Sequence, residues 1–295
     1  MRPSVSWQRK QAVAHEKETD MAGKIIFLDI DMTLVGRKGT IPEFAVSAVR
    51  AARAAGNRVY ACTGRCKAEM YQPIWEMGLD GMIGGNGAYV EDDGQAIYDR
   101  NLDPAVEREQ VDWLVEKGIG FYLETNPGLY CNDLFFPKLA EHVMGACTPA
   151  TLEQGHKVFP HMIETDELYR DDVKKISFLM EDFVDLDELA RHYEGRSTTR
   201  TWGVRSDTHE FGEFGQVGIT KSAAVAKLLE HLGETREDTI AFGDSTVDID
   251  MFELCGYSVA MGNASEDCKA AADYVTDDVD EDGLARAFEK LGLVG

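Results

Sequence analysis

Long apolar stretches and positive charge are both scarce in this sequence. No run among the 295 residues approaches the roughly 18 consecutive apolar residues that a membrane helix needs. Acidic residues number 53 against 30 basic ones, the net charge is -23, and no stripe rich in Lys and Arg stands out. The sequence therefore predicts no membrane partner and no nucleic-acid partner. A small phosphorylated substrate is still possible, because one local positive site would be enough to hold it.

Paired cysteines and a secretion signal are missing as well. The six cysteines include no CxxC pair, which argues against a zinc knuckle or a redox site, so we interpret them as reduced residues of a cytoplasmic protein. Residues 1–20 begin with basic side chains but lack the apolar centre of a signal peptide. We expect 1–20 to be a disordered extension or a start-site artefact, because Met21 directly precedes the first predicted strand.

Strand and helix patterns alternate near both ends of the chain. A strand at 24–28, a helix opened by a capping box of Thr40 and Glu43, and a strand at 58–62 form a β-α-β unit, which predicts a parallel sheet. The alternation resumes at Thr220, whereas hairpin signals mix with helices in between. We therefore predict an α/β fold: a doubly wound parallel-sheet core from 21–87 and 215–295, with an inserted α+β domain from 88–214.

The first strand ends in two carboxylates, Asp29 and Asp31. At strand spacing, residues i and i+2 point the same way, so the two carboxylates repel each other unless a cation lies between them or one is protonated. The pair therefore indicates a metal site or acid/base chemistry. For an isolated Asp-x-Asp, however, a polar turn after a core strand is the more common explanation.

Similar polar clusters follow two more predicted strands, at Thr63-Gly64-Arg65 and at Gly243-Asp244. Parallel strands bring their carboxyl ends to one edge of a sheet, so we expect all three clusters to converge there. Asp29, Asp31, Asp244 and Asp248 would then form a set of oxygen ligands without histidine, which favours Mg2+.

Groups that can hold an anion accompany these acids. They are the Thr63 hydroxyl, the Gly64 backbone, the Arg65 guanidinium and Lys221, which lies near a predicted helix N-terminus. Carboxylates, Mg2+ and anion-binding groups at one edge indicate phosphoryl transfer.

The ordered motifs D-I-D-M-T, T-G-R, a later lysine, G-D-S-T-V-D and A-M-G-N-A resemble those of the haloacid dehalogenase superfamily. The resemblance covers about residues 24–290 and is most specific to the Cof-type phosphatases, whose cap domain lies between the second motif and the lysine. It implies a phosphatase that hydrolyses a small phosphate monoester, such as a sugar phosphate, and a cap that selects the leaving group.

The resemblance also implies a role for each acid. Asp29 would be the nucleophile that forms an aspartyl-phosphate, and Asp31 would be the acid and base that offers Mg2+ its backbone carbonyl. Asp244 would ligate Mg2+, and Asp248 would support the metal or Lys221. The expected phosphate-binding residues are Ile30 and Gly64 through their amides, and Thr63, Arg65 and Lys221.

One motif departs from the family pattern, because Val247 stands where the family has asparagine. Ser245 and Thr246 are the candidates for supplying the lost hydrogen bond. Asn86 and Asn263 match further polar positions near the site. Two alternative functions remain open at this point: a phosphomutase acting on hexose phosphates, and a regulatory phosphosugar-binding protein with little turnover.

A run of acidic residues follows near the C-terminus. We interpret it as a solvated helix entry rather than a calcium loop. Its members are Asp277, Asp278, Asp280, Glu281 and Asp282.

Overall fold

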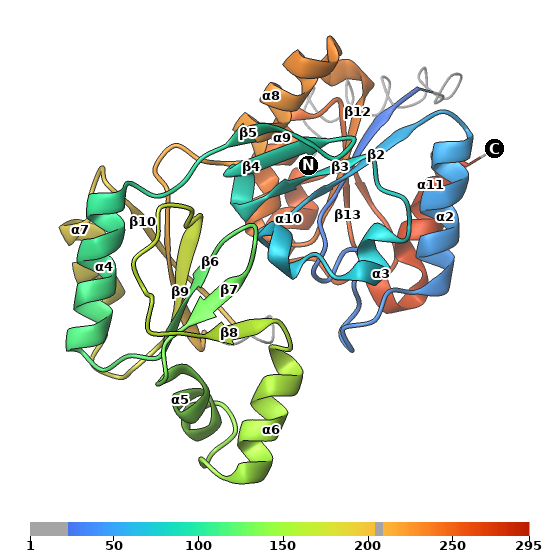
Figure 1. Ribbon diagram of the computed structural model, residues 1–295. Coiled ribbons are helices and arrows are strands. Elements are labelled where there is room, and N and C mark those ends of the chain that lie inside the picture. Colours follow the sequence, from blue (N-terminus) through green and yellow to red (C-terminus); the bar gives the residue numbers. More distant parts are fainter. Residues whose placement is uncertain (1–22, 204–208, 295) are drawn as a thin grey trace, which may run out of the picture. The chain divides into compact units, whose positions relative to one another are not determined.

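The computed structural model describes residues 23–203 and 209–294 (Figure 1). The expected extension at 1–20 lies outside the described residues. Internal contacts divide the described chain into two units. The first comprises residues up to 64, 71–98 and those from 220 onward, and the second comprises 65–70 and 99–219.

The first unit is built on an eight-stranded sheet, in the order β14-β13-β12-β1-β2-β3-β4-β5. Neighbouring strands are parallel from β14 to β3, and β4 is antiparallel to β3. All four residues of the central strand β1 are buried, as expected for a strand covered on both faces. The strands are β1 (Ile25–Leu28), β2 (Arg58–Cys62), β3 (Gly81–Gly84), β4 (Tyr89–Asp92), β5 (Gln95–Asp99), β12 (Thr239–Gly243), β13 (Tyr257–Ala260) and β14 (Tyr274–Val275).

Helices cover both faces of this sheet. One apolar cluster joins β1, β2 and β12 to α8, α9 and α10, while on another side Phe242 of β12 contacts Phe288 of α11, which packs against α2. The doubly wound α/β core is confirmed. Its helices are α2 (Glu43–Ala54), α3 (Gln72–Trp75), α8 (Lys221–Leu232), α9 (Ile249–Leu254), α10 (Glu266–Ala271) and α11 (Gly283–Lys290).

The start of α2 differs from the expectation. The predicted capping box of Thr40 and Glu43 is wrong, because Pro42 occupies the N-cap and no side chain caps the helix. Proline has a backbone angle suited to the start of a helix and no N–H to satisfy, so the helix begins one residue after it. The buried face of α2 still consists of the small apolar residues whose spacing predicted a helix.

The second unit contains a six-stranded sheet, in the order β10-β11-β9-β6-β7-β8. Helices α4 and α7 contribute to one apolar cluster on this sheet, and α5 and α6 contribute to another. The strands are β6 (Phe121–Glu124), β7 (Leu129–Cys131), β8 (Met162–Glu164), β9 (Lys175–Leu179), β10 (Thr198–Trp202) and β11 (Phe211–Gly215); the helices are α4 (Pro104–Glu116), α5 (Phe135–His142), α6 (Pro149–Val158) and α7 (Leu186–His192).

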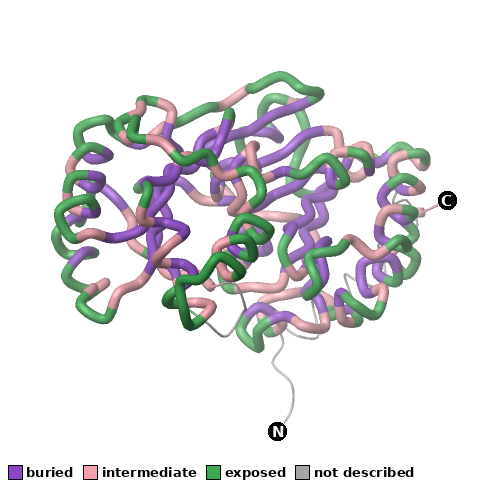
Figure 2. Tube along the Cα trace, turned by 60° about the horizontal axis from the view of Figure 1, so that its bottom comes forward, coloured by how far each residue is buried: buried purple, intermediate pink, exposed green. Residues whose placement is uncertain are grey.

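The boundary between the units differs from the expected position at residue 88. Strands β4 and β5 extend the large sheet, because β4 pairs with β3 along its whole length. Residues 65–70 group with the second unit. Within each unit the inner strands are largely buried, whereas the edge strands β5, β14, β8 and β10 are partly or largely exposed. The helices alternate buried with exposed residues (Figure 2). None of the helices in the described part of the chain is long and apolar enough to cross a membrane.

Candidate active site

Three neighbouring parallel strands deliver polar residues to the same edge of the large sheet. Strand β1 pairs with β2 and with β12, and Leu28 is in register with Ala61 and with Phe242. Asp29, Thr63 and Asp244 are the residues that directly follow these three strands. The expected convergence at the carboxyl ends of the strands therefore has a structural basis in the register.

Lys221, the first residue of α8, also lies at this edge of the sheet. Its side chain is buried, and its Nζ donates hydrogen bonds to Asp29 Oδ1 at 2.7 Å and to Asp248 Oδ1 at 2.6 Å. The helix starts here because the Thr220 side chain accepts a hydrogen bond from the amide of Ala223. A buried ammonium is stable only when carboxylates pair with it, so the three side chains form one electrostatic unit.

Asp248 also organises the turn after β12. Its second oxygen, Oδ2, accepts hydrogen bonds at 3.1 Å from the amides of Asp244 and Ser245 and from the Ser245 hydroxyl. A Cβ atom on Gly243 would lie 2.5 Å from the Asp248 Cγ, so glycine is required for this close approach. Both oxygens of Asp248 thus already accept hydrogen bonds within the protein.

Negative charge exceeds positive charge in this cluster. Carboxylate oxygens of Asp29, Asp244 and Asp248 all lie within 4.8 Å of one another. Burial, together with Asp248, raises the pKa of Asp244 to about 7. Burial also raises the pKa of Asp29 well above its usual range, although Lys221 opposes this effect. Burial favours loss of the proton from Lys221, but Asp248 and Asp29 outweigh it and raise the pKa of that ammonium.

This surplus of buried oxygen ligands fits a hard divalent cation. A cation beside Asp29 and Asp244 would compensate the charge that otherwise favours protonation of these carboxylates. Thr33, which is buried, donates from Oγ1 to Asp244 Oδ1 at 3.3 Å and so orients that carboxylate. Thr33 closes the D-I-D-M-T motif but was not among the predicted site residues.

Asp31 lies in a tight loop after β1 and is exposed. The amides of Leu34 and Val35 donate to the Ile30 carbonyl, and Met32 N donates to Val35 O at 2.8 Å. Met32 has a φ of 63°, which is uncommon for a residue other than glycine. The negative charge of Asp31 contributes to the raised pKa of Asp244.

Thr63, Gly64 and Asn86 lie together beside this edge. Thr63 is buried; its amide donates to Ile83 O, and its carbonyl accepts from the Asn86 amide at 3.1 Å. A Cβ atom on Gly64 would lie 3.2 Å from Asn86 Oδ1, so the Asn86 side chain packs against the Gly64 backbone. Arg65 instead groups with the second unit, where its Nη1 donates to the carbonyl of Glu69.

Two further motif positions have defined surroundings. Val247, where the sequence departs from the family pattern, is 44% exposed. Asn263 donates to the carbonyl of Met32, and Ser245 contacts Asp248 as described. Asp250 was missed: its Oδ2 accepts from the amide and the hydroxyl of Ser222 and so holds the start of α8. The D-I-D at 248–250 could have indicated a second carboxylate for this task.

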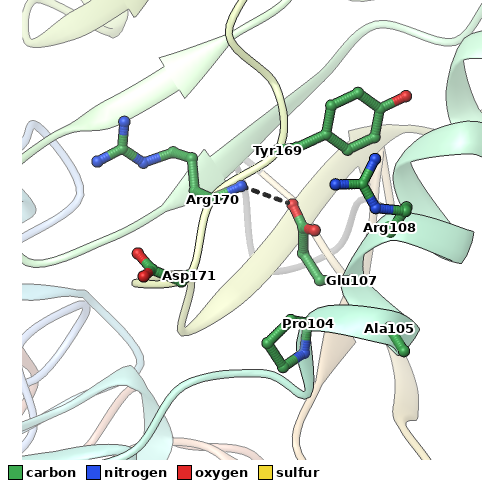
Figure 3. A pocket seen from close by; sticks show the side chains of 7 residues that line it. All are labelled: Pro104, Ala105, Glu107, Arg108, Tyr169, Arg170 and Asp171. Carbon is green, nitrogen blue, oxygen red and sulfur yellow. Dashed lines mark hydrogen bonds between the residues drawn. The ribbon is translucent and has the colours of Figure 1, made fainter.

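The second unit contains a surface hollow of about 620 Å³, formed by the start of α4 and the segment 169–171 (Figure 3). Glu107 points into it towards the backbone of Arg170, whose amide donates to Glu107 Oε1 at 3.4 Å. Burial raises the pKa of Glu107 to about 7. Its lining includes two carboxylates, Glu107 and Asp171, both of the second unit.

Comparisons with known proteins agree with this geometry. The model of the haloacid dehalogenase-like hydrolases matches residues 26–288. The 5-amino-6-(5-phospho-D-ribitylamino)uracil phosphatase YwtE of Bacillus subtilis is 27% identical, over 91% of this chain and 98% of its own. The pyridoxal phosphate phosphatase YbhA of Escherichia coli is 27% identical, over 90% and 97%.

Solved structures show the same architecture. The subclass IIB sugar phosphatase BT4131 is 26% identical, with a TM-score of 0.71, over 92% of this chain and all of its own. A protein from Geobacillus kaustophilus, at 24% identity and a TM-score of 0.76 over 92% of this chain and 100% of its own, shares the fold. With its carboxylates and buried lysine at the carboxyl ends of a parallel sheet, the chain belongs to the haloacid dehalogenase-like hydrolases, as a phosphatase of the Cof type.

Proposed function

We propose that this enzyme hydrolyses a small phosphate monoester, such as a sugar phosphate, through a covalent aspartyl-phosphate on Asp29 and with the help of Mg2+. The observation that carries this proposal is the contact of the buried Lys221 ammonium with Asp29 at 2.7 Å, at the edge where Asp244 also lies. A cation held against a carboxylate lets that carboxylate approach an anionic phosphate, which would otherwise repel it.

In the first half of the reaction, an oxygen of Asp29 forms a bond to phosphorus while the bond to the leaving oxygen breaks. Asp31 donates a proton to the leaving oxygen. In the second half, Asp31 takes a proton from water, and the water oxygen attacks phosphorus and releases phosphate and free Asp29. Ionised Asp29 is required for the attack, and the attraction of Lys221 favours that state against the effect of burial.

The remaining site residues hold the phosphate and the metal. The Thr63 hydroxyl, Lys221 and the amides of Ile30 and Gly64 bind the phosphoryl oxygens in this proposal, and Arg65 is a further candidate. Bound Mg2+ would neutralise charge on the phosphate, with Asp29, Asp244 and the carbonyl of Asp31 as its ligands. The contacts of Asp248 with Lys221 favour a role in holding that lysine.

Val247 bears on the alternative of a binding protein with little turnover. An exposed side chain at this position leaves the contacts among Asp29, Lys221 and Asp248 intact, which supports catalysis. The cytoplasm is the compartment that we propose, since all six cysteines are free thiols.

Phosphate release from a panel of phosphorylated metabolites, measured with Mg2+ and with EDTA, tests the proposal. We expect release that needs the metal and that is lost in Asp29→Asn. Asp267→Asn, which changes an exposed carboxylate on α10, should leave release unchanged. In Asp31→Asn mixed with 4-nitrophenyl phosphate, whose leaving group departs with little help from a proton, acid-quenched protein should carry one phosphoryl group on the peptide that contains Asp29. An active enzyme without this adduct would exclude the covalent route, and a phosphorylated sugar as product would indicate a mutase.

A further inference from the structure

The loop that carries Asp31 is held by residues from the C-terminal part of the first unit. We propose that Asn263 is a positioning residue for Asp31, and that the acidic run near Asp278 holds the far end of the same loop. This inference rests on the proposed function, because it concerns the proton donor of that reaction.

Asn263 uses both ends of its side-chain amide. Its Nδ2 donates to the Met32 carbonyl at 2.8 Å, and its Oδ1 accepts from the Val279 amide at 2.8 Å. A carbonyl can only accept and an amide N–H can only donate, so the two partners determine the orientation of the Asn263 side chain. The side chain therefore links the residue after Asp31 to Val279, which lies within the acidic run.

Met32 needs such a contact because its backbone is strained. A φ of 63° is unfavourable for a side chain with a Cβ atom and persists where surrounding contacts hold it. Two hydrogen bonds do so here, from Met32 N to Val35 O and from Asn263 to Met32 O. Because Met32 directly follows Asp31, a change in the Met32 backbone would move the backbone from which the Asp31 side chain extends.

The far end of the loop is held by charge. The two terminal nitrogens of Arg37 donate to the two oxygens of Asp278, each at 2.7 Å, and Nη1 also donates to Asp280 at 2.8 Å. A Cβ atom on Gly36 would lie 2.1 Å from Asp280 Oδ1, so the loop and the acidic run approach closely. The acidic run thus has a structural partner, beyond the solvated role expected from the sequence.

General acid catalysis depends on leaving-group chemistry, which gives the inference a specific readout. A poor leaving group needs a proton from Asp31 as its bond to phosphorus breaks, whereas a good one departs with little help. kcat/KM reports the steps up to transfer of the phosphoryl group to Asp29, and these include the proton donation. Displacement of Asp31 should therefore lower kcat/KM more for the substrate with the poorer leaving group.

The test compares kcat/KM of Asn263→Asp on phenyl phosphate and on 4-nitrophenyl phosphate, two probes of similar shape. Aspartate keeps the acceptor for Val279 but loses the donor to Met32. We expect kcat/KM to fall for both probes, and the fold-loss for phenyl phosphate to be at least roughly ten times the fold-loss for 4-nitrophenyl phosphate. A small misplacement of a catalytic group can cost up to ~100-fold in rate, so this difference is within reach.

Asn57→Asp is the matched control. Asn57 is a buried asparagine of the same unit whose side chain bonds the backbone groups of Lys24, Ala52 and Leu293. Asn57→Asp should lower kcat/KM for phenyl phosphate and for 4-nitrophenyl phosphate by the same factor. Equal losses in Asn263→Asp, or the same selectivity in Asn57→Asp, would overturn the inference while the proposed function stands. Wild-type protein that hydrolyses neither probe nor any metabolite would overturn both. If Asn263→Asp does not fold, Asn263→Ala gives the same comparison.

Discussion

Replacing Lys221 by methionine removes the ammonium that lies between Asp29 and Asp248 and keeps a side chain of similar length. Each of its two contacts, at 2.7 and 2.6 Å, is worth about 6 kcal/mol of attraction at an effective dielectric constant of about 20. Much of that sum is offset by the cost of burying the ammonium. The expected net loss is about 3–5 kcal/mol, the range typical of a buried ion pair that loses one partner.

The loss should depend strongly on pH. Without Lys221, which lowers both values, the pKa values of Asp29 and Asp244 rise further above those of the unfolded chain, and that of Asp244 is about 7 even with the lysine present. Between the unfolded and folded pKa values, the folded variant binds more protons than the unfolded chain, so its stability falls as pH rises. We expect most of the loss at pH 8 and little of it near pH 4.

Urea unfolding of the wild type and of Lys221→Met at several pH values measures this difference, and added MgCl2 should restore part of it at pH 8. Lys227→Met is the control, because Lys227 lies on the same helix, is exposed, and contacts the Tyr98 ring instead of a carboxylate. An equal loss at pH 4 and pH 8 would show that the lysine acts through packing and would refute the electrostatic reasoning.

Folding raises the pKa of Glu107 from 4.5 to about 7, so this carboxyl destabilises the folded state as pH rises through that interval. Glu107→Gln should remove this pH-dependent loss of stability, which amounts to at most about 3 kcal/mol. Urea unfolding at pH 5 and pH 8 measures this loss of stability. Glu116→Gln, at an exposed position of the same helix, is the control and should lose stability between pH 5 and pH 8 as the wild type does. Cys147 is the exposed cysteine, and burial raises the pKa of the other five thiols. Cys147→Ser should therefore abolish the fast phase of thiol labelling at pH 8. A fast phase that survives in this variant would contradict the prediction. Gly243→Ala should lower both stability and phosphate release, because its methyl group would displace Asp248; unchanged release would show that the turn can rearrange.

Much of the large sheet could be predicted from the sequence, because its strands are short apolar runs that end in polar motifs. The positions of Asp29, Thr63, Lys221 and Asp244 after strands or at a helix start followed from local patterns alone. The hairpin of β4 and β5 could not be assigned in the same way, since a hairpin signal is local and does not specify which sheet the hairpin joins. Thr40 failed as a cap because Pro42 competes locally for the helix start.

By itself, the sequence determined which chemical groups this protein has and the strand ends from which they extend. Hydrophobic periodicity and motifs involve residues that are close together in the sequence, so they can be recognised without the fold. Only the tertiary structure decided which groups touch. Lys221 meets Asp29 across 192 positions, and Asn263 meets Met32 across 231. Such contacts depend on strand register and on the packing of helices onto the sheet, and no local pattern encodes either of them. The same is true of the raised pKa of Asp244, since burial and neighbouring charges exist only in the folded chain.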